Sequence, residues 1–135
     1  MSESDTQKAI VDLIRLRGGV VTRINSGSML AKSQTDRVYR VQLADKGTSD
    51  IIALYKGVYL AIEVKHGKNK ATDEQIEFLE SVAKAGGVGL IAYDVGFVHQ
   101  TLIMLDCVVS GNITLQGMKS DFIARENNLL FIRGE

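Results

Sequence analysis

Two short apolar runs joined by one turn constrain the fold of this chain more than any other stretch. Residues 48–55 read TSDIIALY, residues 58–65 read VYLAIEVK, and Lys56-Gly57 lies between them. Both runs are rich in Ile, Leu, Val, Ala and Tyr, and an X-Gly pair between two such runs is typical of a two-residue hairpin turn. The sequence therefore predicts an antiparallel β-hairpin over this stretch.

The register of the hairpin brings three ionisable side chains together. If Tyr55 pairs with Val58, continuing the pairing along both runs places Asp50 directly opposite Glu63. Directly opposed residues point to the same face, with Cβ atoms roughly 4.5–5.5 Å apart. Side chains alternate along a strand, so Lys65 shares the face of Glu63. We therefore expect two facing carboxylates with an amine beside them.

Two facing carboxylates in an otherwise apolar strand pair need a positive partner, because an unpaired buried charge is costly. Mg²⁺ and Mn²⁺ prefer oxygen ligands and are commonly held by one or two carboxylates with waters and substrate phosphates. Lys65 could hold or polarise a water beside such an ion. The residue types of this D-x12-E-x-K pattern are typical of metal-dependent phosphodiester hydrolysis.

With its neighbours, this pattern resembles the core motif of the PD-(D/E)xK nuclease superfamily. It is most similar to the VRR-NUC branch, the virus-type replication-repair nucleases. The similarity covers roughly residues 3–93. The residues that carry it are Glu3, Arg23-Ile-Asn25-Ser-Gly27, Gly47-Thr-Ser-Asp50, Glu63-Val64-Lys65 and Gln75.

The resemblance implies a fold and an activity. The fold would be a single α/β domain over residues 1–135, with a restriction-endonuclease-like core: a mixed central β-sheet flanked by helices, in the order αβββαβ. Residues 94–135 would be a C-terminal extension. The activity would be that of a Mg²⁺- or Mn²⁺-dependent DNA endonuclease, selective for branched DNA such as a Holliday junction, in replication, recombination or repair. A homodimer is expected, because a resolvase cuts two strands symmetrically and a twofold dimer supplies two matched sites.

The resemblance also assigns roles to individual residues. The metal ligands would be Asp50, Glu63, Glu3 and the backbone carbonyl of Val64. Lys65 would orient or activate the attacking water, and Gln75 would approach the active site. The expected DNA contacts are Arg23, Asn25, Ser26, Lys32, Arg37, Arg40, His66, Lys68 and Lys70.

Several of these assignments have a structural alternative. Glu3 could simply be an acid in the first turn of a helix, where it favours the helix dipole. Gln75 is the last residue of T-D-E-Q, a capping-box pattern that explains it fully, unless its side chain is free to approach the site. Arg23 and Asn25 could form an ordinary exposed face, and Arg37 and Arg40 a solvated edge strand. The loop His66-Gly-Lys68-Asn-Lys70, the densest positive cluster, could be an exposed polar turn.

Apolar periodicity predicts the remaining elements. Helices are expected over residues 3–17, 72–86, 95–105 and 119–126. Strands are expected over residues 20–25, 37–42, 88–93, 112–115 and 129–132, and residues 26–36 read as a Ser-rich loop. Arg17 shares the apolar stripe of the first helix with Ile10 and Ile14.

Composition narrows the function classes. The 135 residues have a formal net charge of zero, whereas proteins that grip nucleic acid by bulk charge usually show a basic footprint. DNA binding would therefore need a local basic groove. The single Cys107 excludes an intramolecular disulfide or a Cys-rich zinc site, and is expected to be a small buried residue. With no signal-peptide pattern and no bilayer-spanning apolar run, we expect a cytoplasmic protein without membrane contact.

Other function classes stay open. A restriction-type or exonuclease-type PD-(D/E)xK nuclease would share the same hairpin. A non-catalytic DNA-binding module of this fold would be expected to lose Asp50, Glu63 or Lys65, and all three are present. A structural or protein-interaction domain could hold them as a plain salt-bridge network. Metal titration followed by cleavage assays would separate these classes.

Overall fold

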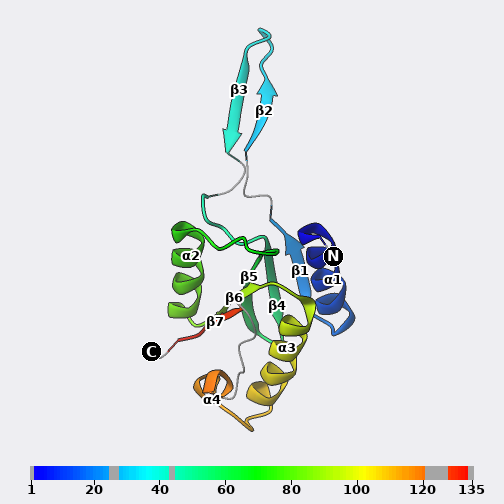
Figure 1. The fold of residues 1–135 in the computed structure, drawn as a ribbon, viewed down its shortest axis with the longest axis vertical. Helices are drawn as coiled ribbons and strands as arrows, with labels where there is room; N and C mark the ends of the chain where they lie inside the picture. The colour runs from blue at the N-terminus through cyan, green and yellow to red at the C-terminus, as the bar shows by residue number, and fades with distance from the viewer. Residues whose placement is uncertain (1, 25–27, 43–44, 121–127, 134–135) are drawn as a thin grey trace.

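A computed structural model describes residues 2–24, 28–42, 45–120 and 128–133 (Figure 1). The helices in these ranges are α1 (Glu3–Leu16), α2 (Asp73–Lys84), α3 (Val95–Val109) and α4 (Leu115–Ser120). The strands are β1 (Val20–Arg23), β2 (Ser28–Lys32), β3 (Val38–Gln42), β4 (Ile51–Tyr55), β5 (Val58–Val64), β6 (Val88–Ala92) and β7 (Leu129–Phe131).

The described strands form one central sheet and one separate ribbon. The central sheet has the order β1-β4-β5-β6-β7, and it is mixed, because β5 is antiparallel to β4 and parallel to β6. Leaving the ribbon of β2 and β3 aside, the elements from α1 to β6 follow as helix, three strands, helix and strand. The chain is thus a single-domain α/β fold with a five-stranded mixed sheet, as expected. The expected αβββαβ order holds only with β2 and β3 set aside, and the restriction-endonuclease-like core stays a prediction.

Helices cover both faces of the central sheet (Figure 1). On one face, α1 and α3 pack against each other and against the sheet, with Ile10, Ile14, Val98, Leu102 and Leu105 buried. On the other face, α2 packs on β5 and β6 through Leu79 and Val82. The apolar stripes predicted for the three helices are therefore confirmed, and the core lies in two layers on either side of the sheet.

The predicted β4–β5 hairpin has the predicted register. Tyr55 pairs with Val58, and the ladder continues to Ile51 opposite Ile62. The turn residues Lys56 and Gly57 both have positive φ, 48° and 83°. Positive φ at both central residues is the geometry of a type I′ turn, whose twist matches that of the flanking strands. This short turn fixes which residues face each other at the far end of the hairpin.

Two helices begin with complete capping boxes. The Ser2 side chain accepts a hydrogen bond from the backbone of Asp5, and the Asp5 side chain accepts one from the backbone of Ser2. Thr72 and Gln75 make the same pair of bonds at α2. Each box satisfies two backbone donors that a helix start otherwise leaves free. The box at Thr72 was predicted from the sequence.

Three expected elements differ from the structure. The stretch expected as a loop contains β2, which pairs with β3 rather than with the central sheet. The expected strand over residues 112–115 is wrong, because Thr114 accepts a hydrogen bond from the backbone of Gly117 and α4 begins at Leu115. The helix expected over residues 119–126 overlaps only the end of α4, and residues 121–127 lie outside the described ranges.

The ribbon of β2 and β3, residues 28–42, is called the arm below. It projects away from the body, and no other labelled element lies beside it (Figure 1). Its two strands pair from Ser28 opposite Gln42 to Lys32 opposite Val38. The arm leaves the body after β1 and returns to it before β4, so both of its connections lie at the same edge of the central sheet.

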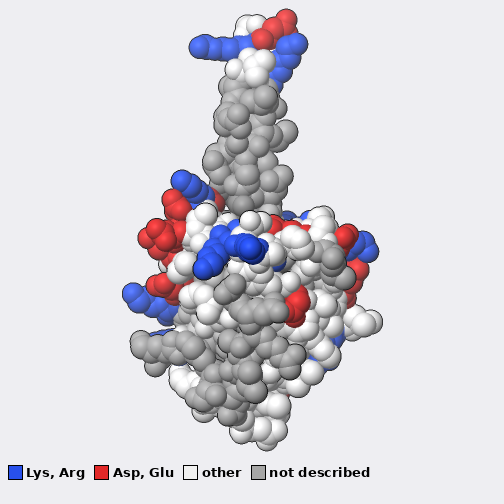
Figure 2. All heavy atoms as spheres, viewed as in Figure 1, with Lys and Arg blue, Asp and Glu red and all other residues white. Residues whose placement is uncertain are grey.

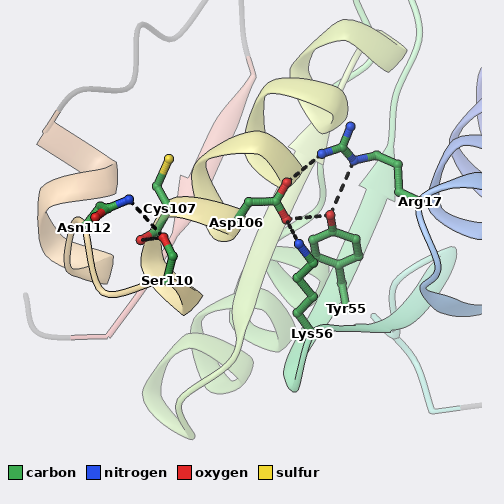
Figure 3. Close-up of polar contacts among 7 residues, drawn as sticks. All are labelled: Arg17, Tyr55, Lys56, Asp106, Cys107, Ser110 and Asn112. Carbon is green, nitrogen blue, oxygen red and sulfur yellow. Dashed lines mark hydrogen bonds and ion pairs between the residues drawn. The ribbon is translucent and has the colours of Figure 1, made fainter.

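A polar cluster joins α1, the hairpin turn and α3 at the opposite end of the hairpin (Figure 3). The carboxylate of Asp106 pairs with Arg17 at 2.6 Å and with Lys56 at 2.7 Å, and accepts a hydrogen bond from the Tyr55 hydroxyl at 2.7 Å. The hydrogen bonds from Lys56, Tyr55 and Arg17 hold the pKa of Asp106 below its usual range. Arg17, the C-cap residue of α1, can therefore lie next to the apolar residues of that helix because its charge is paired with Asp106 of α3.

Two further expectations concern burial and membranes. Cys107 was expected to be buried, but it is only half-buried, near Ser110, which donates to its backbone carbonyl (Figure 3). Within the described ranges, none of the helices combines the length and apolar character needed to cross a bilayer.

Candidate active site

The candidate site lies where β4 begins and β5 ends, at one end of these two inner strands and close to the first turn of α2. Because β4 and β5 are antiparallel, Asp50 and Glu63 meet at this end. Asp50 directly precedes β4, Glu63 is the penultimate residue of β5, and Lys65 directly follows β5. Side-chain alternation along β5 places Glu63 and Lys65 on the face that α2 covers.

Asp50 is held by backbone groups from two neighbouring strands. Its Oδ2 accepts a hydrogen bond from the backbone N–H of Val64 at 2.9 Å. Its backbone carbonyl accepts one from the N–H of Ile24 at 2.7 Å. These bonds fix the Asp50 carboxylate against the end of β5. The charge of Asp50 is close enough to Glu63 to raise the pKa of that carboxyl group.

Glu63 is a buried acid with one oxygen satisfied and one free. Only 2% of the residue is exposed. Its Oε1 accepts a hydrogen bond from Gln75 Nε2 at 2.9 Å and lies 3.5 Å from Lys65 Nζ. Its Oε2 is buried and has no hydrogen-bond donor among the described residues. A buried carboxylate oxygen without a partner normally costs stability or binds something that the protein supplies from outside.

The electrostatics of the pair follow from this arrangement. Burial raises the pKa of Glu63 to about 8, the nearby charge of Asp50 adds to the rise, and Lys65 opposes it. With no cation present, Glu63 is therefore mainly protonated at neutral pH, and its proton can be shared with Asp50. Two ionised carboxylates offer only acceptors to each other, so either a proton or a cation must lie between them.

Gln75 connects the site to α2 with both ends of its amide. Its Oε1 accepts the backbone N–H of Thr72 at 2.9 Å and completes the capping box. Its Nε2 donates to Glu63 at 2.9 Å. These two roles were expected to exclude each other if the side chain reached back to Thr72. That expectation is wrong, because one primary amide has an acceptor end and a donor end that serve both.

The donor set fits a hard divalent cation. The unpartnered Oε2 of Glu63 and the carboxylate of Asp50 are the oxygen ligands that Mg²⁺ and Mn²⁺ prefer, and such ions are often held by only two carboxylates plus water and phosphate. Among the described residues, no three His, Cys, Asp or Glu side chains gather closely enough to hold a metal. Glu3, half-buried in the first turn of α1, is thus not brought in as a third ligand. A ligand role for the Val64 carbonyl stays a prediction.

The basic loop, residues 66–70, continues directly from Lys65. His66, Lys68 and Lys70 are all exposed. The loop is tied down by a turn in which Asn69 N–H donates to the His66 carbonyl, and by the Tyr93 hydroxyl, which donates to the Asn69 carbonyl. Its positive charges are therefore held beside the acid pair, where a polyanion could reach both.

The remaining expected DNA contacts are spread over two places. Arg23 donates to Gln7 at 2.5 Å, so α1 already engages its guanidinium. Lys32 and Arg37 are exposed near the tip of the arm, and Lys32 lies 3.6 Å from Asp36. Arg40 pairs with Leu30 through the arm's backbone. The expected contacts Asn25 and Ser26 lie outside the described residues.

Sequence reasoning missed two residues near this site. Tyr93 follows β6 and holds the basic loop, a role that only the parallel pairing of β5 with β6 reveals. Ser49 is fully buried, and its Oγ has no partner among the described residues. Its place in Gly47-Thr-Ser-Asp50, inside the motif, was the one available signal.

The chain matches no known protein-family model and no curated protein sequence. The site therefore has to be interpreted from its own geometry.

Proposed function

We propose that the protein is a Mg²⁺- or Mn²⁺-dependent DNA nuclease with a restriction-endonuclease-like core. The observation that carries this proposal is the buried, unpartnered Oε2 of Glu63 beside Asp50, with Lys65 Nζ at 3.5 Å from the same carboxyl group. The resemblance to VRR-NUC nucleases supports the same conclusion from the motif. The proposal accounts for why two acids and an amine are gathered at one end of two otherwise apolar strands.

Each residue has a role that its contacts support. Asp50 and Glu63 would hold the cation, and Gln75 keeps the Glu63 carboxyl in place from behind. Lys65, whose side chain is 14% exposed, would orient a water and offer a positive charge to the phosphate oxygens as negative charge develops on them. The basic loop would hold the DNA backbone beside the acids.

A bound Mg²⁺ or Mn²⁺ would polarise the phosphodiester and lower the pKa of a bound water. The protein itself supplies the two ligands, the water-orienting amine and the cover of α2. Hydrolysis of this class gives a 5′-phosphate and a 3′-hydroxyl in the superfamily that the motif resembles.

The test is cleavage of labelled linear, flap and four-way DNA with Mg²⁺ or Mn²⁺. We expect Asp50→Asn and Glu63→Gln to abolish cleavage with an unchanged circular dichroism spectrum. We expect Lys65→Met to lower the rate by about 10²–10³, as loss of a charge-stabilising donor does in other enzymes. Glu80→Gln, at an exposed acid on α2, serves as the control. Full cleavage by both acid variants would overturn the proposal.

The same assay addresses the preferred substrate. We propose branched DNA, and faster cutting of four-way junctions than of linear duplex is the expected result. Preference for linear ends or for one short sequence would instead favour the exonuclease-type or restriction-type alternative.

A homodimer is part of the proposal. An exposed apolar row supports it: Val20, Leu54 and Tyr59 lie directly opposite one another on β1, β4 and β5 and are 73%, 51% and 43% exposed. Directly opposed residues share one face, so the row is continuous and a second copy could cover it. Sedimentation equilibrium should show a dimer that Leu54→Lys converts to a monomer. A monomeric wild type would remove this part of the proposal.

A further inference from the structure

The arm is a two-stranded ribbon separate from the central sheet. Its strands pair only with each other, and no helix of the described chain covers them (Figure 1). An isolated two-stranded ribbon gains little stability from its own packing. Its exposed side chains near the tip, among them Lys32, Arg37 and Val38, are therefore available to a partner.

Charge is distributed unequally between the arm and the rest of the chain. The arm contains Lys32, Arg37 and Arg40 against one acid, Asp36, for a net charge of +2. The chain as a whole is neutral, so the remainder has a net charge of −2. Figure 2 shows basic atoms beside acidic ones at the tip of the arm, basic atoms again on the front of the body, and acidic atoms on both sides of the body, toward α2 and toward α1. The net charge of the arm therefore favours an anionic partner over a cationic one.

Residues 45–50, which follow the arm in sequence, are fixed on α2 and lead into the acid pair. A Cβ on Gly47, which has φ of +90°, would lie 2.5 Å from the carbonyl oxygen of Glu74, so the turn at Gly47 packs directly on the first turn of α2. Lys46 pairs with Glu74 at 3.2 Å. Asp50 follows three residues after Gly47. The segment that follows the arm is therefore held on α2 close in sequence to Asp50, and the basic loop, residues 66–70, follows Lys65 on the other side of the acid pair.

A partner that meets both basic segments must be long and continuously anionic. Five-residue strands span about 17 Å, and the major groove of B-DNA, about 12 Å wide, accepts a two-stranded β-ribbon. We propose that the arm is a duplex-binding ribbon that enters the major groove of DNA whose backbone lies at Asp50 and Glu63. The identification of the polyanion as DNA rests on the proposed function.

The test separates duplex binding from catalysis. Affinity for a 30-base-pair duplex is measured in EDTA over a series of salt concentrations, for the wild type and for Lys32→Glu with Arg37→Glu. Each lost phosphate contact reduces the slope of log K against log salt by about 0.9, so the double variant should show a slope smaller by about 1.8. Lys8→Glu with Lys84→Glu makes the same change in net charge at two exposed positions on α1 and α2 and should keep the wild-type slope. Asp36→Asn should bind more tightly than the wild type.

Hydrolysis of bis(p-nitrophenyl) phosphate with Mn²⁺ is measured in parallel, because this small diester reaches the acid pair without touching the arm. We expect the arm variants to hydrolyse it at the wild-type rate. Wild-type duplex binding by the Lys32→Glu, Arg37→Glu protein would overturn the role of the arm and leave the proposed function standing. Arm-dependent binding without any hydrolysis by the wild type would overturn the proposed function instead. Loss of dimerisation in the arm variants, with wild-type duplex binding per protomer, would identify a second copy as the partner and also overturn the inference.

Discussion

Replacement of Glu63 by glutamine should make the metal-free protein more stable at alkaline pH. Glu63 has a pKa raised from 4.5 to about 8 by burial and by Asp50. A group with a raised folded-state pKa contributes its full stability below the unfolded-state value and loses it as pH rises through the folded-state value. The wild type should therefore lose stability between about pH 4.5 and pH 8, while the variant, which has no proton to lose, should not.

The magnitude follows from the size of the rise. Each tenfold change in proton affinity is worth about 1.4 kcal/mol, so a rise from 4.5 to about 8 amounts to at most ~5 kcal/mol above pH 8. In the Glu63→Gln variant the new amide would still accept from Gln75 and could donate to Asp50, as protonated Glu63 can. We expect equal unfolding free energies near pH 5 and a variant more stable by about 3–5 kcal/mol at pH 9.

Urea unfolding in EDTA at pH 5, 7 and 9 measures this difference, with Glu80→Gln as a control for the loss of one exposed charge. A second series adds Mg²⁺. Saturation to 100 times Kd should stabilise the wild type by about 2.7 kcal/mol and Glu63→Gln much less, because the variant has lost a ligand. If the difference in unfolding free energy between wild type and variant stays constant from pH 5 to pH 9, Glu63 does not hold a proton in the metal-free protein, and the reasoning is refuted.

Three further substitutions test contacts that support the site or lie elsewhere in the fold: the Gln75–Glu63 hydrogen bond, the packing of Gly47 on α2 and the Asp106 cluster. Gln75→Leu should weaken metal affinity about 10–100-fold, as loss of a supporting hydrogen bond does at other metal sites, and isothermal titration measures it; an unchanged Kd would show that the bond to Glu63 is incidental. Gly47→Ala should cost about 3 kcal/mol in thermal unfolding, because a positive φ and a close contact with α2 both oppose a Cβ, whereas Gly57→Ala, with a similar φ and open space, should cost only about 1 kcal/mol; equal costs would contradict the close packing. Asp106→Ala should cost about 2 kcal/mol by leaving its donors unpaired, without changing nuclease activity, and an activity loss would connect that cluster to the site.

The β4–β5 hairpin could be predicted because its information is local. A two-residue turn leaves one register, and that register alone places Asp50 opposite Glu63. The capping boxes at Ser2 and Thr72 were predictable for the same reason, since every partner lies within three residues. Local sequence therefore specified both the end of the hairpin that carries the acids and the helix start that covers it.

What could not be predicted depends on partners distant in sequence or on a choice between equal local signals. The sequence indicated no partner for Arg17, and only the packing of α1 on α3 brings Asp106 to it. The double role of Gln75 needed the distance between α2 and β5. The Ser-rich stretch before Lys32 has weak strand propensity, and it becomes β2 only because β3 pairs with it. Residues 112–115 have the apolar content of a strand, yet Thr114 favours the start of a helix instead.

Because the Gln75 amide bonds both to Thr72 and to Glu63, the folding of the first turn of α2 is coupled to the position of the Glu63 carboxyl group. If the first turn of α2 opens, the amide releases the Glu63 carboxyl at the same moment, and if that carboxyl is drawn toward a cation, the helix start is held more firmly. Slow deuterium uptake by the first amides of α2 would then report occupancy of the site from outside it. The start of α2 would then both cover the acid pair and report, through its exchange rate, whether a cation is bound there.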